Sequence, residues 1–315
     1  MRAAGLVAAA LLMASPLAAQ PVPTFSASVE AVYVDVFVTR DGRPVGGLTA
    51  ADFEVRDNGV KQDVSLASLD EVPIVAVMVF DASASLAGAR LDDLRAAGRA
   101  LLSGLRAQDE AMLLTFSHEL RLAVPPRSDR SAVQRALDRL VPGGHTALWD
   151  ALYAGLKLPV ALGRPLVVLF TDGRDDLSWL SPEQVLDVAR ESNALVHVVA
   201  IVPPAQQVLA AGTSGALRTE TRAVEPPRLR ALRAVAEVTG GRLWPASASA
   251  QLGSTFLGVL AEMQSRYLLS YTPQGVPREG WHRLAVKVKG RKGTTVRSRG
   301  AYFVAETAQA PPPAR

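Results

Sequence analysis

Hydrophobic residues follow two different patterns along this chain. In the stretch 29–39, four valines occupy alternate positions and share one face, as in a strand buried on one side. Residues 73–80 and 165–171 are instead almost continuously apolar, which is typical of parallel strands covered on both faces. Segments with helical periodicity separate these runs. The middle of the chain therefore predicts an α/β fold with a doubly wound, mainly parallel sheet.

The two ends of the chain predict β-structure. Residues 25–70 hold the alternating run and an Asp-Asn-Gly hairpin signal, and residues 266–305 hold further short strands, the last over 294–304. Such short strand sets bury too little apolar surface to stand alone, so we expect them to pair into a small β-sandwich. The α/β core, residues 72–265, is then inserted between them. Residues 203–227 predict a loop without regular structure, and residues 306–315, with three consecutive prolines, predict a disordered tail.

The first twenty residues have the composition of a secretory signal peptide. Arg2 precedes a small and apolar run over residues 3–13, and a small-residue segment follows it. A membrane anchor is the alternative, but this run is shorter than the roughly 20 residues that a span needs. We therefore expect cleavage near residue 20 and an exported protein that is periplasmic, at the cell surface or secreted. The mature chain is expected to have no transmembrane span.

The composition excludes several classes of metal site, nucleophile and partner. The chain has 315 residues and no cysteine, which excludes disulfides, thiolate metal sites and a thiol nucleophile, so any metal is held by oxygen or histidine. There are 34 basic and 30 acidic residues, and for an exported protein this small excess predicts no nucleic-acid partner. Some of the basic residues form a candidate surface for an anionic envelope polymer, although a solvated outer face is the default interpretation. They are Lys287, Lys289, Arg291, Lys292, Arg297 and Arg299.

Oxygen-bearing side chains gather where the buried strands are expected to end. Asp81, Ser83 and Ser85 follow the first apolar run at alternate positions, and Asp172 follows the second. Thr146 lies between them, in a Gly-Gly-His-Thr segment at the expected start of a helix. Ligands bind at the carboxyl ends of the strands in doubly wound sheets, and carboxylate and hydroxyl oxygens suit hard divalent cations. The sequence therefore predicts a site for Mg²⁺, with Mn²⁺ or Ca²⁺ as alternatives.

The D-x-S-x-S motif at 81–85, the G-G-x-T-x-L motif around Thr146 and the T-D-G motif around Asp172 resemble, in this order, one known family. It is the von Willebrand factor type A domain, with its metal-ion-dependent adhesion site. The resemblance covers residues 72–265, and the flanking segments are similar to exported bacterial relatives. It implies that the two serines and the threonine contact the metal, with the two aspartates acting directly or through water. It also implies a non-enzymatic, adhesion-type role, in which an acidic residue of a partner protein fills an open coordination position.

Two other functions compete with this hypothesis. A structural envelope protein with a vestigial metal site would carry the same motifs. A metal-dependent hydrolase is the third hypothesis, but the phosphatase pattern needs a second aspartate two residues after the first, where this chain has Ser83. The sequence contains neither a G-x-S-x-G nor an H-E-x-x-H motif.

Each part of the predicted site also has a structural interpretation. Ser83 and Ser85 could cap the following helix, and Asp172 with the next glycine could form an ordinary turn. Asp175 and Asp176 fit a solvated acidic turn better than an assisting role at the metal. It is the set, in this order, that favours a metal site.

Two histidines and two tryptophans can likewise have either a structural role or a role at the predicted site. His197 lies in an apolar strand and is expected to be a core histidine, whereas His145 is a candidate for the rim of the site. Trp149 and Trp179 fall near the same end of the sheet. They are either contacts for a partner or packing residues.

Overall fold

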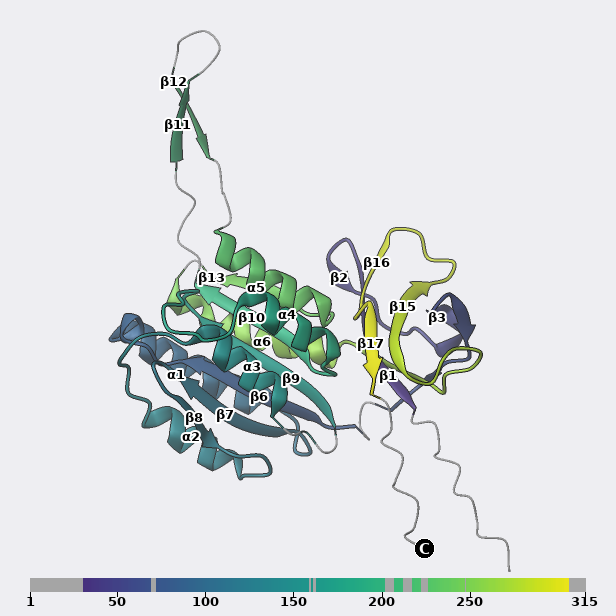
Figure 1. The fold of residues 1–315 in the computed structure, drawn as a ribbon, viewed down its shortest axis with the longest axis horizontal. Helices are drawn as coiled ribbons and strands as arrows, with labels where there is room; N and C mark the ends of the chain where they lie inside the picture. Colours follow the sequence, from purple (N-terminus) through teal and green to yellow (C-terminus); the bar gives the residue numbers. More distant parts are fainter. Residues whose placement is uncertain are drawn as a thin grey trace, which may run out of the picture.

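The structure, a computed structural model, shows an α/β domain beside a smaller β-sandwich (Figure 1). It describes residues 31–68, 72–158, 160, 163–201, 207–211, 217–221, 226–246 and 248–305. The predicted signal peptide and the predicted proline-rich tail lie outside the described residues. Within the described residues, no helix is both long enough and apolar enough to cross a membrane.

A six-stranded sheet forms the centre of the α/β domain. Its order is β13, β10, β9, β6, β7, β8, and all neighbours are parallel except β7 and β8. The strands are β6 (Ile74–Asp81), β7 (Glu110–Phe116), β8 (Leu120–Val124), β9 (Arg164–Thr171), β10 (Leu195–Ile201) and β13 (Arg242–Ala246). β6 is buried along its whole length, with Met78 and Phe80 in one core cluster and Val77 and Val79 in the other. Both faces of this strand are covered, which explains its continuously apolar sequence.

In the described residues, three α-helices cover each face of this sheet. One face carries α1 (Ala89–Gly104), α2 (Arg130–Asp138) and α6 (Leu252–Gln264), and the other carries α3 (Leu148–Lys157), α4 (Pro182–Glu191) and α5 (Pro227–Val238). Short 3₁₀ turns span Ala50–Asp52, Ala84–Leu86 and Ser249–Gln251. α4 begins with a capping box formed by Ser181 and Gln184. The prediction of a doubly wound, mainly parallel sheet is confirmed.

The two ends of the chain meet in the β-sandwich. One sheet has the order β16, β1, β14, β5, with β2 also paired to β1, and the other has the order β17, β15, β3, β4. Its strands are β1 (Val32–Arg40), β2 (Arg43–Pro44), β3 (Phe53–Asp57), β4 (Val60–Gln62), β5 (Ser65–Leu66), β14 (Tyr267–Tyr271), β15 (Gly280–Val288), β16 (Thr294–Arg297) and β17 (Ala301–Val304). β1 pairs with β14, and β3 with β15. Each sheet therefore combines strands from before and after the α/β domain, as the fold prediction requires.

Two predictions about the course of the chain are wrong. Within residues 203–227 the structure has an antiparallel hairpin of β11 (Gln207–Ala211) and β12 (Leu217–Thr221). These strands have five residues each and a mixed composition, so neither gives a clear alternating signal. The predicted strand 294–304 is two strands, because the chain passes from the β16 sheet to the β17 sheet at residues 298–300.

Charged side chains join the two domains at the amino ends of the parallel strands. Glu262, near the end of α6, lies 2.8 Å from Arg266 and 3.1 Å from Arg242, and it also pairs with Arg297 of β16. The Glu262 side chain is only 2% exposed. A buried ion is stable only when it is paired, so this cluster favours one placement of the sandwich on the α/β domain.

The prediction of a solvated basic face is wrong for two of its six residues, which lie at this interface. The three lysines of that face are exposed, as a solvated outer face requires. Arg297, however, pairs with Glu262, and Arg299 donates to Oδ1 of Asn193 at 2.7 and 2.8 Å. The arginines at the end of this segment therefore hold the two domains together.

His197 of β10 is buried beside the same cluster, as expected for a core histidine. Its Nδ1 accepts a hydrogen bond from Nε1 of Trp244 at 3.0 Å, so the proton of the neutral ring lies on Nε2, which is 3.4 Å from Glu262. Burial lowers the pKa of His197 to about 3, because the neighbouring arginines offset the attraction of the carboxylate.

We expect acid to destabilise the wild-type protein more than a His197→Gln variant. The unfolded chain binds a proton at this histidine near pH 6.5, whereas the folded chain binds it only near pH 3. Between these values the free energy of unfolding falls with decreasing pH by up to about 1.4 kcal/mol per pH unit. Urea unfolding at several pH values measures this, with the half-exposed His118→Gln as the control. Parallel profiles for wild type and His197→Gln would show that His197 titrates normally in the folded protein.

Candidate metal site

Two loops meet at the carboxyl end of β6, which ends at Asp81. The N–H of Gly143 donates to the carbonyl oxygen of Ala82 at 2.8 Å. The N–H of Ala84 donates to the carbonyl oxygen of Gly144 at 3.2 Å. The Asp-Ala-Ser-Ala-Ser segment and the Gly-Gly-His-Thr segment therefore lie side by side.

The end of β9 brings in the third segment. The hydroxyl of Thr171 donates to Oδ2 of Asp81 at 3.0 Å and accepts the N–H of Gly173 at 2.9 Å. Oδ1 of Asp172 accepts the N–H of Arg174 at 3.1 Å, so this aspartate does form the turn that its sequence allowed. The same carboxylate is close enough to raise the pKa of Asp81.

Asp81 is a buried carboxylate with a deficit of positive charge around it. Its side chain is 0% exposed, and Oδ1 accepts the N–H of Ser83 at 2.9 Å. Burial raises the pKa of Asp81 to about 6, and the charge of Asp172 adds to this effect. No Lys, Arg or His side chain among the described residues pairs with Asp81. A cation bound here would supply the missing positive charge.

Hydroxyl groups complete the candidate site. Oγ of Ser83 and Oγ of Ser85 are 3.1 Å apart, and Ser83 and Thr146 are both buried. Ser83 precedes the turn Ala84–Leu86, but its side chain makes no capping hydrogen bond there, which disfavours the simple capping interpretation. Two carboxylates and three hydroxyls fit a hard divalent cation. Among the described residues, no group of three His, Cys, Asp or Glu side chains is arranged to hold a metal ion. The proposed set has only two carboxylates, so its five oxygen ligands stay a prediction.

The acidic loop after β9 has a structural role that the sequence did not reveal. Oδ1 of Asp176 accepts the N–H of Thr146 at 2.7 Å, and Oδ1 of Asp175 accepts the N–H of Leu148 at 2.9 Å. Asp150 of α3 accepts the N–H groups of two residues in that loop. Asp175 and Asp176 are exposed, as expected for a solvated acidic turn, and they also fix the loop of Thr146.

The structure also distinguishes which of the nearby histidine and tryptophan candidates are exposed and which are packing residues. His145 is 73% exposed and its Nδ1 lies 3.0 Å from Asp176, which places it at the rim beside Thr146. Trp149 is buried in the core and is a packing residue. Trp179 is 94% exposed, so it remains a candidate contact for a partner.

We expect Gly144→Ala to disturb this site, whereas Gly143→Ala should not. Gly144 has φ of +74°, and a β-carbon there would lie 1.9 Å from Nδ1 of His118. Gly143 has open space at the same point. The Gly144 variant should lose about 1–2 kcal/mol in urea unfolding because an L-residue is strained at this φ. Equal stability of the two variants would contradict a tightly fitted loop.

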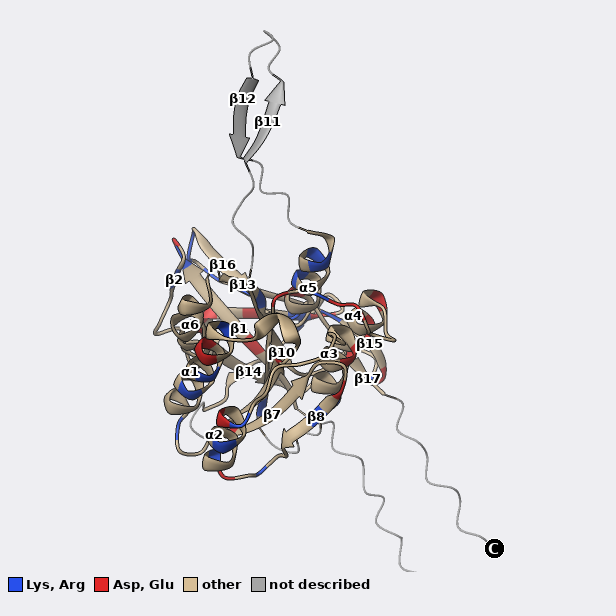
Figure 2. Ribbon diagram, turned by 90° about the vertical axis from the view of Figure 1, so that its left-hand side faces the viewer, with Lys and Arg blue, Asp and Glu red and all other residues tan. Residues whose placement is uncertain are grey.

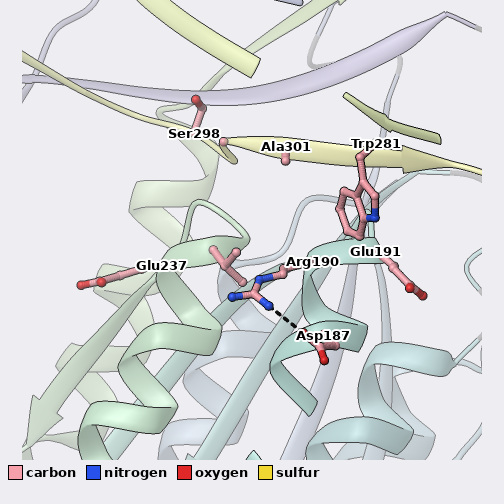
Figure 3. Close-up of a pocket in the computed structure, with 9 residues that line it drawn as sticks. Asp187, Arg190, Glu191, Glu237, Trp281, Ser298 and Ala301 are labelled. Carbon is pink, nitrogen blue, oxygen red and sulfur yellow. Dashed lines mark hydrogen bonds and ion pairs between the residues drawn. The ribbon is translucent and has the colours of Figure 1, made fainter. Parts of the chain in front are cut away.

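A groove of about 900 Å³ lies elsewhere, between the two domains. The ends of α4 and α5 line it together with β15 and β17, and Trp281 and the Asp187–Arg190 ion pair of 2.6 Å border it (Figure 3). Because α4 and α5 run opposite to the parallel strands, their ends lie at the amino edge of the sheet. None of the five candidate metal ligands lines this groove.

Comparisons with known proteins relate this geometry to one family. Residues 76–174, which include all five candidate ligands, match the model of the von Willebrand factor type A domain. An uncharacterized protein of Mycobacterium tuberculosis is 36% identical over 111 residues, which span 32% of this chain and 17% of that protein.

The similar solved structures include two with low identity to this chain. A von Willebrand factor type A protein from Catenulispora acidiphila has 13% identity and a TM-score of 0.49, over 89% of this chain and 75% of that chain. Proximal thread matrix protein 1 from the mussel byssus, solved with a zinc-occupied MIDAS motif, has 17% identity and a TM-score of 0.46, over 64% of this chain and 48% of that chain. Residues 76–174 therefore match the von Willebrand factor type A domain, and the doubly wound sheet that contains them has the α/β fold expected of that domain.

Proposed function

We propose that this protein is an exported binding module that holds a divalent cation and uses it to bind an acidic residue of a partner protein. The proposed ligands are Asp81, Ser83, Ser85, Thr146 and Asp172. The observation that carries the proposal is the buried Asp81 carboxylate, which lies beside hydroxyls and has no cationic partner among the described residues. Mg²⁺, Mn²⁺ and Ca²⁺ all accept such an oxygen set.

Charge explains why such a site would bind a further anion. The three hydroxyl ligands are neutral, and one or two carboxylates leave the ion with capacity for another negative ligand. The site lies at an exposed edge, where His145 and Arg174 are 73% and 68% exposed. A carboxylate on the surface of another protein could therefore reach the ion.

The non-enzymatic role is also a proposal. Von Willebrand factor type A domains are in general interaction modules. A hydrolase of the phosphatase kind would need a carboxylate at position 83, where the structure has the buried Ser83 hydroxyl. The N-terminal apolar run supports export, and we propose that the protein acts in the periplasm, at the cell surface or after release. Its three exposed lysines remain a candidate surface for an anionic envelope polymer.

A crosslinking pull-down from envelope extract, with Mg²⁺ or with EDTA, tests this function. Wild type and Asp187→Ala, which changes an exposed aspartate at the other edge of the sheet, should capture the same partner only with Mg²⁺. Asp81→Ala should capture none. Capture that is indifferent to EDTA and to Asp81→Ala would favour the structural envelope protein. Turnover of phosphate or ester substrates that Asp81→Ala abolishes would favour the hydrolase.

A further inference from the structure

Two exposed arginines contact residues of the candidate metal site. Arg90, the second residue of α1, donates from Nη1 to the carbonyl oxygen of Ser85 at 3.2 Å. Nε of Arg174 lies 3.6 Å from Oδ2 of Asp172. One guanidinium group comes from the start of α1 and the other from the loop after β9, and both border the place where a cation would bind.

A third arginine reaches the same border from α5. A β-carbon on Gly173, the residue after Asp172, would lie 3.6 Å from Nε of Arg228, so the side chain of Arg228 passes over this turn. Figure 2 shows basic positions in blue at the beginning of α5. We call Arg90, Arg174 and Arg228 the arginine rim.

The arginine rim has few ion-pair partners among the described residues. No carboxylate in the described part of the chain pairs with Arg90 or Arg228, and Arg174 pairs with Asp172. The carboxylates of the neighbouring loop, Asp175 and Asp176, accept backbone N–H groups, and in the described part of the chain neither forms an ion pair with the rim. The rim can therefore accept carboxylates from outside the chain.

Metal binding would free the third guanidinium as well. A cation held by Asp172 competes with Arg174 for the same carboxylate oxygens. With the cation in place, all three arginines would surround an ion that needs one further anionic ligand. A partner with a single carboxylate would satisfy the ion and leave the arginine rim unpaired.

We propose that the partner of this site is an acidic protein segment, in which one carboxylate binds the metal and at least one neighbouring carboxylate binds the arginine rim. The inference rests on the proposed function, because the metal sets the position of the first carboxylate. Guanidinium groups bind carboxylates through paired hydrogen bonds. Each exposed pair contributes only about two- to fivefold in affinity, but two such pairs beside one ion together give roughly tenfold.

Arg174 gives the sharpest test, because its two effects have opposite signs. Removing it relieves the competition for Asp172, so Arg174→Ala should bind Mn²⁺ about two- to fivefold more tightly. The same variant should bind an acidic segment less tightly, since one guanidinium of the rim is gone. A residue with a purely structural role would not change these two affinities in opposite directions.

The experiment uses the purified full chain, calorimetry with Mn²⁺ and fluorescence anisotropy with three labelled peptides of equal length. The peptides contain no glutamate, one glutamate or three consecutive glutamates in a Gly-Ser background. With Mn²⁺, the three-glutamate peptide should bind about tenfold more tightly than the one-glutamate peptide. The triple variant of Arg90, Arg174 and Arg228 to alanine should remove this difference. Arg278→Ala, which changes an exposed arginine of the sandwich, should not.

The outcomes separate this inference from the proposed function. Equal, Mn²⁺-dependent binding of the one- and three-glutamate peptides would overturn the acidic segment and leave the metal-dependent function standing. Tighter Mn²⁺-dependent binding of inorganic polyphosphate than of the three-glutamate peptide would overturn a protein partner in favour of a phosphate polymer. If no peptide binds in an Mn²⁺-dependent way, both the inference and the proposed function are wrong.

Discussion

Replacing Glu262 with alanine is expected to lower the free energy of unfolding by about 3–5 kcal/mol. Glu262 is the carboxylate on which Arg266, Arg242 and Arg297 converge at the domain interface. Burial favours its neutral form, but His197 and the arginines act more strongly together and lower the pKa of Glu262. Glu262 is therefore charged at neutral pH. Its removal leaves several guanidinium groups without a counter-charge, one of them, Arg266, completely buried.

Urea unfolding of the Glu262 variants measures this effect. Glu119→Ala is the control, because its side chain is 75% exposed and its loss should change stability by no more than about 0.5 kcal/mol. Glu262→Gln keeps the size of the side chain and removes its charge, so it should fall between the two. If Glu262→Ala were as stable as Glu119→Ala, the charged cluster would contribute nothing to holding the domains together.

A loss of similar size, about 3–5 kcal/mol, is expected for Asp57→Ala in the sandwich core. Asp57 is fully buried and accepts hydrogen bonds from Tyr302 at 2.7 Å and from Tyr271 at 3.0 Å. Nδ1 of His282 lies 2.8 Å from its other oxygen. Burial, together with the Asp57 charge, raises the pKa of both tyrosines, so they remain hydrogen-bond donors. Without Asp57, three buried polar groups lose their partner.

Asp63→Ala is the matched control for this second variant. Asp63 is an exposed residue of the same sandwich, just after β4. Thermal unfolding, followed by tryptophan fluorescence, to which Trp281 on β15 contributes, should show a much lower midpoint for Asp57→Ala and an unchanged one for Asp63→Ala. Equal midpoints would show that the tyrosines and the histidine find other partners when Asp57 is removed.

The sequence predicts those parts of the fold in which burial repeats regularly along the chain. β6 and β9 are covered on both faces and read as apolar runs, and β1 buries alternate valines. The hairpin of β11 and β12 gives no such period, and the crossing between β16 and β17 falls inside an apparently continuous strand. The ion pairs of the domain interface could not be predicted either. Glu262 and Arg297 lie far apart in sequence, and the sequence around each is typical of a solvated charged residue.

The sequence likewise predicts one part of the candidate site and not the other. Asp81, Ser83, Ser85, Thr146 and Asp172 are recognisable because they follow strand ends in a motif. The groups that hold them in place have no such signal. Thr171 reaches Asp81 across 90 residues of chain, and Asp176 reaches Thr146 across 30. Contacts of this kind depend on the three-dimensional fold, and sequence spacing alone does not reveal them.

A calorimetric titration with Mg²⁺ and Mn²⁺ tests the central claim most directly. Wild type should bind one divalent cation per chain at the candidate site, and Asp187→Ala should bind it equally well. Asp81→Ala should lose this binding, because it removes the buried carboxylate that faces Ser83 and Thr171. If wild type and Asp81→Ala gave the same titration, the five oxygen ligands would not form a metal site and the proposed function would be wrong.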